Sequence, residues 1–405
     1  AFASIAIVST AAAQSSIAFV NGQWFNGRTF DARTMYVVQG VLRTSRPAVI
    51  DTTIDLQRKF VVPPFGEAHN HNIEGSSRTS QVLASYINDG IFYVLNPNSL
   101  PRSKTLLAGQ INKPDGIDVI FSNGGLNVTR GHPWDLVERN IARGTWLRSD
   151  AEGAFYHTID NRAALDAKWP AILAGKPDFI KIYLLFSNEH QQRLNDTTGF
   201  HGLDPALVPE IVQRAHAAKL RVAAHIENVY DFRTAVAAGV DIIAHMPGYG
   251  WLGNTDSTQF MLTRADAEAA AHRGSAVVTT LGFGQRANTP GRASGQLRRD
   301  ALNAHNLKLL KDAGVRIAIG SDNYRAHSKS ETQYLSDLRV FSNLELLKLW
   351  SETTPRVIFP ERKLAELRDG YEASFLVLAA DPLADFTNTE RITLRVKQGR
   401  LLPVP

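Results

Sequence analysis

The stretch Phe60-Val-Val-Pro-Pro-Phe-Gly-Glu-Ala-His-Asn-His71 joins a short apolar run, a turn and a pair of histidines. The β-branched residues near its start favour a strand, and the two prolines favour the end of that strand. In an extended chain residues i and i+2 point to the same side, so His69 and His71 would direct two imidazoles to one point. Such a pair suits a borderline metal such as zinc. Because His-x-His pairs are common by chance, a metal site needs further ligands from other parts of the chain.

Outward from this stretch, apolar strand-like runs alternate with helical patterns across residues 63–369. This alternation indicates the α/β class and a (β/α)8 TIM barrel, whose active site lies at the C-terminal ends of the strands. A doubly wound open sheet is the alternative, but no Gly-x-Gly-x-x-Gly turn follows any of the runs. Three helical patterns end in a glycine that fits a helix C-cap. The strand-like runs cover residues 60–65, 91–96, 117–123, 179–186, 221–226, 241–246, 276–283 and 316–322.

Both ends of the chain differ from this middle part. Residues 16–62 and 370–405 read as short strands and turns, and Asn26-Gly27 between two apolar runs is a strong hairpin signal. We therefore expect a small β-sandwich domain built from both chain termini. Long insertions at 124–177, 187–203 and 284–297 follow the third, fourth and seventh strands, where they would rim the active face.

Composition narrows the class of protein. The chain has 405 residues, a net charge of +5 and no cysteine, which excludes disulfides, thiolate ligands and cysteine nucleophiles. No basic run supports a nucleic-acid partner, and no stretch is long and apolar enough for a membrane span.

Residues 1–15 are small and apolar and resemble the remnant of a secretory signal peptide, although an ordinary terminal strand or tail is the alternative. The signal interpretation predicts a periplasmic or secreted protein.

Polar side chains recur at the ends of the predicted strands. Each has an ordinary interpretation alone: a buried histidine is more often a hydrogen-bonded core residue, and an aspartate after a strand can cap the next helix. Lys181 is harder to explain, because a lysine within an apolar strand is rarely buried without a partner. Burial would lower its pKa, and the neutral amine could take up carbon dioxide to form a carbamate able to bridge two cations. The recurring residues are His69, His71, Lys181, His225, His245 and Asp322.

This ordered set resembles the amidohydrolase superfamily of metal-dependent hydrolases, over nearly the whole chain. The lysine on the fourth strand resembles the binuclear branch, and the segments 178–181 and 224–226 look most like imidazolonepropionase-related dipeptidases and prolidases. The approach to His69 departs from the family pattern, because Pro64-Phe65 and Glu67 replace the usual Pro-Gly and aspartate. The glutamate would still supply an acceptor that supports a metal ligand.

The resemblance implies a cofactor and a mechanism. His69 and His71 with Asp322 would hold one divalent metal ion, most simply zinc, and His225 with His245 would hold a second. Lys181, as N6-carboxylysine, would bridge the two. A hydroxide shared by the metals would be the nucleophile, and Asp322 would carry its proton to the leaving group.

Further side chains follow strands on the predicted active face and bear on the substrate. A histidine or tyrosine there could bind the carbonyl oxygen as charge develops, which makes His132 and Tyr183 candidate catalytic residues. An arginine could bind a substrate carboxylate in bidentate fashion, although a solvated loop arginine is the commoner case. The candidate substrate-binding residues are His132, Tyr183, His201, Tyr230, Arg286 and Arg325.

The leading hypothesis is therefore a hydrolase that cleaves an amide bond of the peptide or N-acyl amino acid type in a small, carboxylate-bearing substrate. A lactonase, or a cyclic-amide or heterocycle hydrolase, would use the same binuclear site. A deaminase is less favoured because such relatives usually lack the lysine ligand. A non-catalytic scaffold usually loses metal ligands, and none is missing here. The resemblance also leaves a homo-oligomer open.

Overall fold

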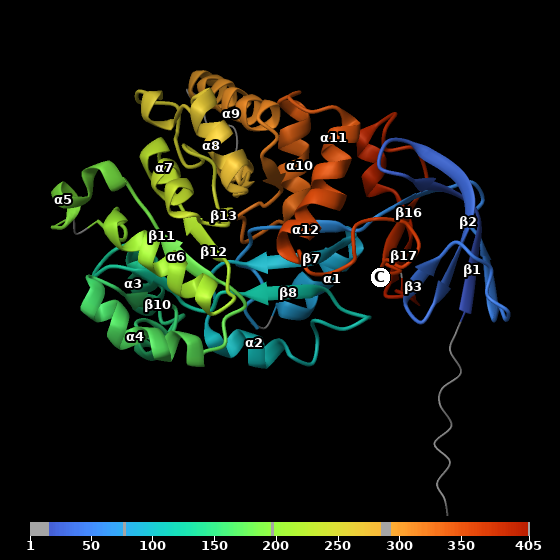
Figure 1. Ribbon diagram of the computed structural model, residues 1–405, viewed down its shortest axis with the longest axis horizontal. Coiled ribbons are helices and arrows are strands. Elements are labelled where there is room, and N and C mark those ends of the chain that lie inside the picture. The colour runs from blue at the N-terminus through green and yellow to red at the C-terminus, as the bar shows by residue number, and fades with distance from the viewer. Residues whose placement is uncertain (1–15, 76–77, 196–197, 285–292, 404–405) are drawn as a thin grey trace, which may run out of the picture.

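A computed structural model of the chain describes residues 16–75, 78–195, 198–284 and 293–403. The predicted signal remnant at 1–15 and the predicted substrate residue Arg286 lie outside the described residues. Two structural units are visible: a barrel surrounded by helices, and a β-sheet beside it to which both ends of the chain contribute (Figure 1).

The barrel has eight strands, and each of the eight predicted runs contributes residues to one of them. Parallel pairing joins β6 to β7 and β8, and joins β11 through β12, β13 and β14 to β15. Backbone bonds link the two sets, from Asp178 N to Phe121 O at 2.8 Å and from Ala68 N to Ile319 O at 2.8 Å. The barrel strands are β6 (Phe65–Glu67), β7 (Ile91–Asn96), β8 (Asp118–Phe121), β11 (Ile180–Tyr183), β12 (Val222–His225), β13 (Ile242–Ile243), β14 (Ala276–Val278) and β15 (Arg316–Ala318).

The first predicted run, 60–65, is divided between the two units. Its beginning forms β5 (Phe60–Val62), which pairs with strands from both chain ends, and only its last residue enters β6. Pro63 and Pro64 separate the two strands, because a proline has no N–H to donate to a sheet ladder. The stretch around the two histidines therefore connects the terminal sheet to the barrel.

The terminal sheet has eight strands in the order β18-β17-β16-β5-β1-β2-β3, with β4 paired to β1. The predicted hairpin is confirmed: Asn26 N bonds to Thr29 O at 3.0 Å, and Gly27 has a φ of +93°. The domain boundaries at 62 and 370 remain predictions. The sheet contains β1 (Ser16–Phe25), β2 (Phe30–Val38), β3 (Val41–Arg43), β4 (Thr52–Asp55), β5, β16 (Phe375–Leu378), β17 (Ile392–Lys397) and β18 (Arg400–Leu401).

Helices cover the barrel and begin and end where capping residues occur. Asn228 caps α7 by accepting from the Tyr230 and Asp231 amides, and Gly239 and Gly274 end α7 and α8 in the left-handed conformation, as predicted. None of the described helices is both long and apolar enough to cross a membrane. The helices are α1 (Thr79–Asn88), α2 (Pro101–Leu107), α3 (Trp134–Ala142), α4 (Arg162–Ala174), α5 (His190–Arg193), α6 (Val208–Ala217), α7 (Val229–Ala238), α8 (Arg264–Arg273), α9 (Ala293–Asp312), α10 (Ser328–Asp337), α11 (Asn343–Lys348) and α12 (Thr354–Ile358).

The insertion that follows β8 adds two strands outside the barrel pattern. β9 (Gly125–Asn127) and β10 (Tyr156–Thr158) pair with each other, and β9 extends the sheet from β11. One continuous hydrophobic core runs from the terminal sheet into the barrel, and in it the Phe65 ring of β6 stacks on Trp350 with centroids 3.7 Å apart. This packing holds β6, and so the segment that carries the two histidines, in a fixed position.

Candidate metal centre

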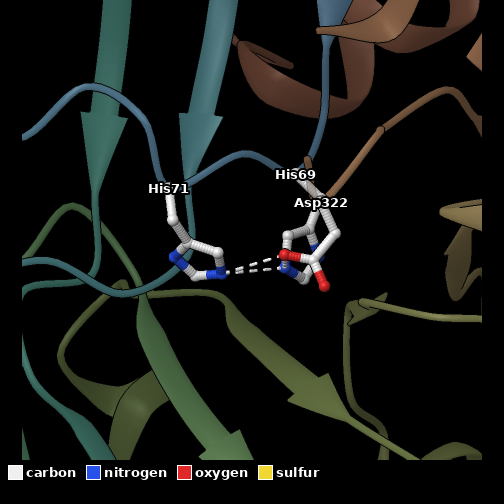
Figure 2. Close-up of side chains that lie close together, drawn as sticks. All are labelled: His69, His71 and Asp322. Carbon is white, nitrogen blue, oxygen red and sulfur yellow. Dashed lines mark hydrogen bonds and ion pairs between the residues drawn. The ribbon is translucent and has the colours of Figure 1, made fainter. Parts of the chain in front are cut away.

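Three of the predicted ligands meet beyond the C-terminal ends of β6 and β15. The Nε2 atoms of His69 and His71 are 3.2 Å apart, and Asp322 Oδ1 lies 3.6 Å and 3.4 Å from them (Figure 2). All three ligand atoms lie within 4.8 Å of one another. Two imidazoles and a carboxylate at this separation form a candidate site for a divalent metal ion.

Backbone carbonyls set the orientation of both imidazoles. His69 Nδ1 is 2.9 Å from Ala244 O, and His71 Nδ1 is 3.1 Å from Asn98 O. A carbonyl oxygen only accepts, so each Nδ1 must carry the proton and each Nε2 presents its lone pair to the common point. The same arrangement of outer hydrogen bonds orients metal-binding histidines generally.

Close backbone contact between the ends of β6 and β15 brings Asp322 to the histidines. The Asp322 amide donates to His69 O at 2.8 Å. A Cβ at Gly320 would lie only 2.7 Å from His69 N, so this approach requires glycine. Asp322 itself has a φ of +48°, a left-handed conformation that aspartate tolerates better than most residues.

Glu67 connects the same two segments. Its Oε1 accepts from the amides of His69 at 3.1 Å and Ser321 at 2.9 Å, and its Oε2 accepts from Ser321 Oγ at 2.8 Å. Burial raises the pKa of Glu67 to about 8. The expected supporting acceptor is therefore present, but it holds the backbone of His69 and the residue before Asp322 and not an imidazole ring.

His225, the last residue of β12, and His245, which follows β13, extend this group of imidazoles. The His245 ring centroid is 4.4 Å from that of His69 and 4.7 Å from that of His225. His245 Nδ1 is 2.9 Å from Thr280 Oγ1, and His225 Nε2 is 3.1 Å from Glu227 Oε1. Each ring thus has one nitrogen held from outside and the other left for a ligand.

Lys181 of β11 lies in this group with its side chain almost entirely enclosed. The residue is 1% exposed, and no hydrogen bond or ion pair joins its Nζ to any other described residue. Nζ is 5.3 Å from the centroid of the Tyr183 ring. Burial lowers the pKa of Lys181 to about 7, although the nearby Asp322 carboxylate opposes this shift. A neutral, nucleophilic amine is therefore accessible near neutral pH.

Burial also decides the charge of the other ligands. It lowers the pKa of His71 to about 4 and holds the pKa of His69, His225 and His245 well below the ordinary value, with Lys181 adding to the effect. Burial raises the pKa of Asp322 to about 7, and Lys181 opposes it. The imidazoles are thus neutral and able to coordinate, as metal binding requires.

A cavity of about 200 Å³ opens onto these ligands. As predicted, the insertion 124–177 contributes to its rim, through residues that include His132, Leu136 and Arg139. His132 and Tyr183 both line the cavity, with ring centroids 4.9 Å and 5.5 Å from that of His225. The predicted residues that line the cavity are His69, His71, His132, Lys181, Tyr183, His225, His245 and Asp322.

The other predicted substrate residues lie elsewhere among the described residues. His201 is buried behind the cavity wall, where its Nε2 is 3.0 Å from Thr129 O and its carbonyl accepts from the His132 amide. It therefore supports the loop that carries His132. Tyr230 is 45% exposed on α7, and Arg325 is exposed; neither lines the cavity. A substrate role for these three stays a prediction.

Several lining residues were missed by reasoning from sequence. Arg139 lies on α3 with its Nη1 2.9 Å from Asp135 Oδ2, and Tyr249 stacks on the His245 ring with centroids 4.0 Å apart. Asn98 follows the predicted second strand and Tyr324 lies two residues after Asp322, so position after a strand could have indicated both. Arg139 had no such signal, because only the fold of the insertion places it at the rim.

Comparison with known structures identifies solved proteins that share this fold over nearly their whole length. An amidohydrolase structure matches 96% of this chain and 99% of its own, with a TM-score of 0.73 and 20% sequence identity. The fold is that of the amidohydrolases. A prolidase complexed with N-methylphosphonate-L-proline matches 96% of this chain and 99% of its own (TM-score 0.73, 18% identity). Ochratoxinase from A. niger matches 97% of this chain and 96% of its own (TM-score 0.73, 16% identity). No protein-family model and no curated protein sequence matches the chain.

Within the amidohydrolase fold of this chain, β11, the last residue of β12 and the segments that follow β6, β13 and β15 supply the six predicted ligands to one cavity. In a barrel of this kind, catalytic groups collect at the C-terminal ends of the strands. The ligand set and the fold therefore indicate the same face of the molecule.

Proposed function

We propose that this protein is a metal-dependent hydrolase of the amidohydrolase superfamily that cleaves an amide bond of the peptide or N-acyl amino acid type. The observation that carries the proposal is the convergence of His69 Nε2, His71 Nε2 and the Asp322 carboxylate beside three further ligand-type side chains. The similarity in fold to prolidase, Xaa-Pro dipeptidase and ochratoxinase structures supports the choice of an amide bond.

The donor atoms fit a pair of divalent cations. Four imidazoles are held neutral by burial, and their outer hydrogen bonds leave one ring nitrogen of each available for coordination. His69, His71 and Asp322 would hold one cation, and His225 and His245 the other. Zinc is the expected metal because it prefers nitrogen ligands with a carboxylate. The buried Lys181, whose Nζ has no hydrogen bond or ion pair with the described residues, would join them as N6-carboxylysine, formed when its neutral amine adds to carbon dioxide and loses a proton.

Bound cations of this kind lower the pKa of a water molecule and polarise a carbonyl group. The chain supplies the remaining functions. Asp322 would accept a proton from the attacking water and return it to the leaving amine. His132 and Tyr183 would donate to the carbonyl oxygen as negative charge develops there, since both line the cavity and burial keeps the Tyr183 hydroxyl protonated by raising its pKa.

The cavity also bears on the substrate. Its volume of about 200 Å³ suits a small molecule. Arg139 lies at the rim and offers a guanidinium to a substrate carboxylate, in the role expected of Arg286 or Arg325. We therefore include a carboxylate-bearing substrate in the proposal.

A periplasmic or secreted location is proposed from residues 1–15 alone.

Metal analysis and a substrate panel test the proposal. The purified protein should bind two equivalents of zinc, and the zinc-loaded form should hydrolyse members of a panel of dipeptides and N-acyl amino acids. Removal of metal with a chelator should abolish turnover, and added zinc should restore it. If the zinc-loaded protein hydrolysed lactones and none of the amides, the proposed amidase would be wrong and the same site would be that of a lactonase. A protein that binds no divalent metal ion would support the non-catalytic scaffold instead.

A further inference from the structure

Asn98 lines the cavity next to the candidate metal ligands. It follows β7 and is 1% exposed. Its backbone is fixed on both sides: its amide donates to Asn96 Oδ1 at 3.4 Å, and its carbonyl accepts from His71 Nδ1 at 3.1 Å. The side chain therefore starts from a rigid point directly behind a metal ligand.

The side-chain amide of Asn98 is buried, yet neither its Oδ1 nor its Nδ2 has a hydrogen-bond partner within the described parts of the chain. Neighbouring asparagines differ in this respect. Asn96 Nδ2 donates to Ile73 O at 3.0 Å, and Asn70 Nδ2 donates to Ser321 Oγ at 2.8 Å. A buried amide without partners costs free energy, and proteins seldom leave one in that state without a purpose.

The surroundings of Gly125 show where the Asn98 amide lies relative to the site. A Cβ built on Gly125 would lie 3.3 Å from Asn98 Oδ1, 3.3 Å from Lys181 Cγ and 2.5 Å from the Tyr183 ring. The three side chains thus converge above a residue that leaves room only for hydrogen. All three residues also line the cavity, so the Asn98 side chain lies at its wall beside Lys181, the proposed carboxylysine.

We propose that the Asn98 side chain binds the amide group of the substrate, with Oδ1 accepting from the substrate N–H and Nδ2 donating to a substrate oxygen. This inference rests on the proposed amide hydrolysis and adds a determinant of specificity to it. Asparagine is neutral and carries one donor group and one acceptor, which matches a secondary amide. An ester has no N–H, so Oδ1 would remain unpaired against it, and a site built to bond an N–H discriminates against an analogue without one.

The test compares one N-acyl amino acid that the enzyme hydrolyses with its ester analogue, in which oxygen replaces the N–H. In zinc-loaded Asn98→Leu, kcat/KM should fall by roughly 30-fold for the amide and only about threefold for the ester, since the amide loses two hydrogen bonds and the ester one. The zinc content should not change. The melting temperature should stay the same or rise, because leucine removes two unpaired polar atoms from a buried position. Asn98→Ala should show the same selectivity if leucine prevents folding.

The adjacent Ser99 offers a matched control. Its hydroxyl is also buried without a partner among the described residues, but it does not line the cavity. Ser99→Ala should leave kcat/KM for the amide and for the ester unchanged, and the melting temperature should also stay the same. Equal losses on amide and ester, or no loss on the amide, would overturn the role of Asn98 while leaving the hydrolase in place. A lower melting temperature together with lost zinc would show a structural role. Wild-type protein inactive on every amide would overturn the proposed function and this inference with it.

Discussion

Two lysines are buried at opposite ends of the barrel, and their surroundings differ completely. Lys181 is 1% exposed, Lys397 is 0% exposed, and burial lowers the pKa of both. Lys397 extends from β17 of the terminal sheet to Asp118, the first residue of β8. Lys181 lies among residues that follow the C-terminal ends of the strands. Among the described residues, one buried lysine therefore lies at each end of the barrel.

Lys397 and its charged neighbours Asp118 and Arg362 are paired with one another. Its Nζ lies 2.6 Å from Asp118 Oδ1 and 2.6 Å from Lys113 O, and Arg362 Nη1 lies 2.7 Å from Asp118 Oδ2. Arg362 also pairs with Glu372, whose Oε1 accepts from Tyr93 OH at 3.0 Å. This network joins the terminal sheet to the barrel. Around Lys181 the imidazoles and the carboxylate converge without pairing to the amine.

The contrast separates a structural cluster, the paired groups around Lys397, from a functional cluster, the candidate ligands around Lys181. A fully hydrogen-bonded buried network rigidifies a fold, whereas groups buried without partners cost stability and persist where they serve a ligand. Removing a member of the first cluster should therefore cost stability. Removing a member of the second should cost function, with stability unchanged or improved.

The largest effect is expected for Lys181→Ala. Loss of the proposed carboxylysine should reduce activity by more than about a hundredfold, since even outer partners of metal ligands contribute up to that much. Zinc content, measured by elemental analysis, should fall below two equivalents, and small carboxylic acids should restore part of the activity. The melting temperature should not drop. Wild-type turnover by this variant would refute the bridging role.

Lys397→Met tests the other end of the barrel. It leaves Asp118 without one of its two cations, so we expect a loss of about 3–5 kcal/mol in the free energy of unfolding. Denaturant unfolding measures this loss. The kcat of the remaining folded protein should equal that of wild type. If activity per folded molecule fell as well, the separation of the two clusters would be wrong.

Asp322→Asn should act on the reaction and leave the fold intact. Without a carboxylate to carry the proton, kcat should fall by about a hundredfold, the lower part of the range for general acid–base catalysis. Burial disfavours the charge of Asp322, so a neutral amide should leave the melting temperature unchanged or higher. Circular dichroism and steady-state kinetics together measure both effects. An undiminished kcat would remove Asp322 from proton transfer.

The smallest effect is expected at the rim. Arg139→Met should raise KM by about tenfold for substrates with a free carboxylate, the worth of one charge-assisted hydrogen bond, and should leave neutral amide analogues unchanged. Arg325→Met is the matched control, because Arg325 does not line the cavity and should have little effect on either substrate. If Arg325→Met raised KM for carboxylate-bearing substrates and Arg139→Met did not, the carboxylate-binding role would belong to Arg325.

The ligands could be predicted from sequence because each of them lies at or just after a strand of a regular barrel. Periodicity placed the strands, and barrel geometry brings their C-terminal ends together. Arg139, Tyr249 and the pairing of Lys397 with Asp118 could not be predicted in this way. Arg139 and Tyr249 lie in connecting segments, and the lysine–aspartate pair joins residues 279 positions apart in the chain.

The sequence by itself determined the barrel, the terminal strands and the residues able to bind metal, because these depend on local periodicity and on residue chemistry along the chain. Only the tertiary structure decided which buried polar groups are paired. It showed that Lys397 pairs with Asp118, that the Asn98 amide is buried without a partner among the described residues and that His201 supports a loop, because hydrogen bonding depends on distances between segments that are remote in sequence.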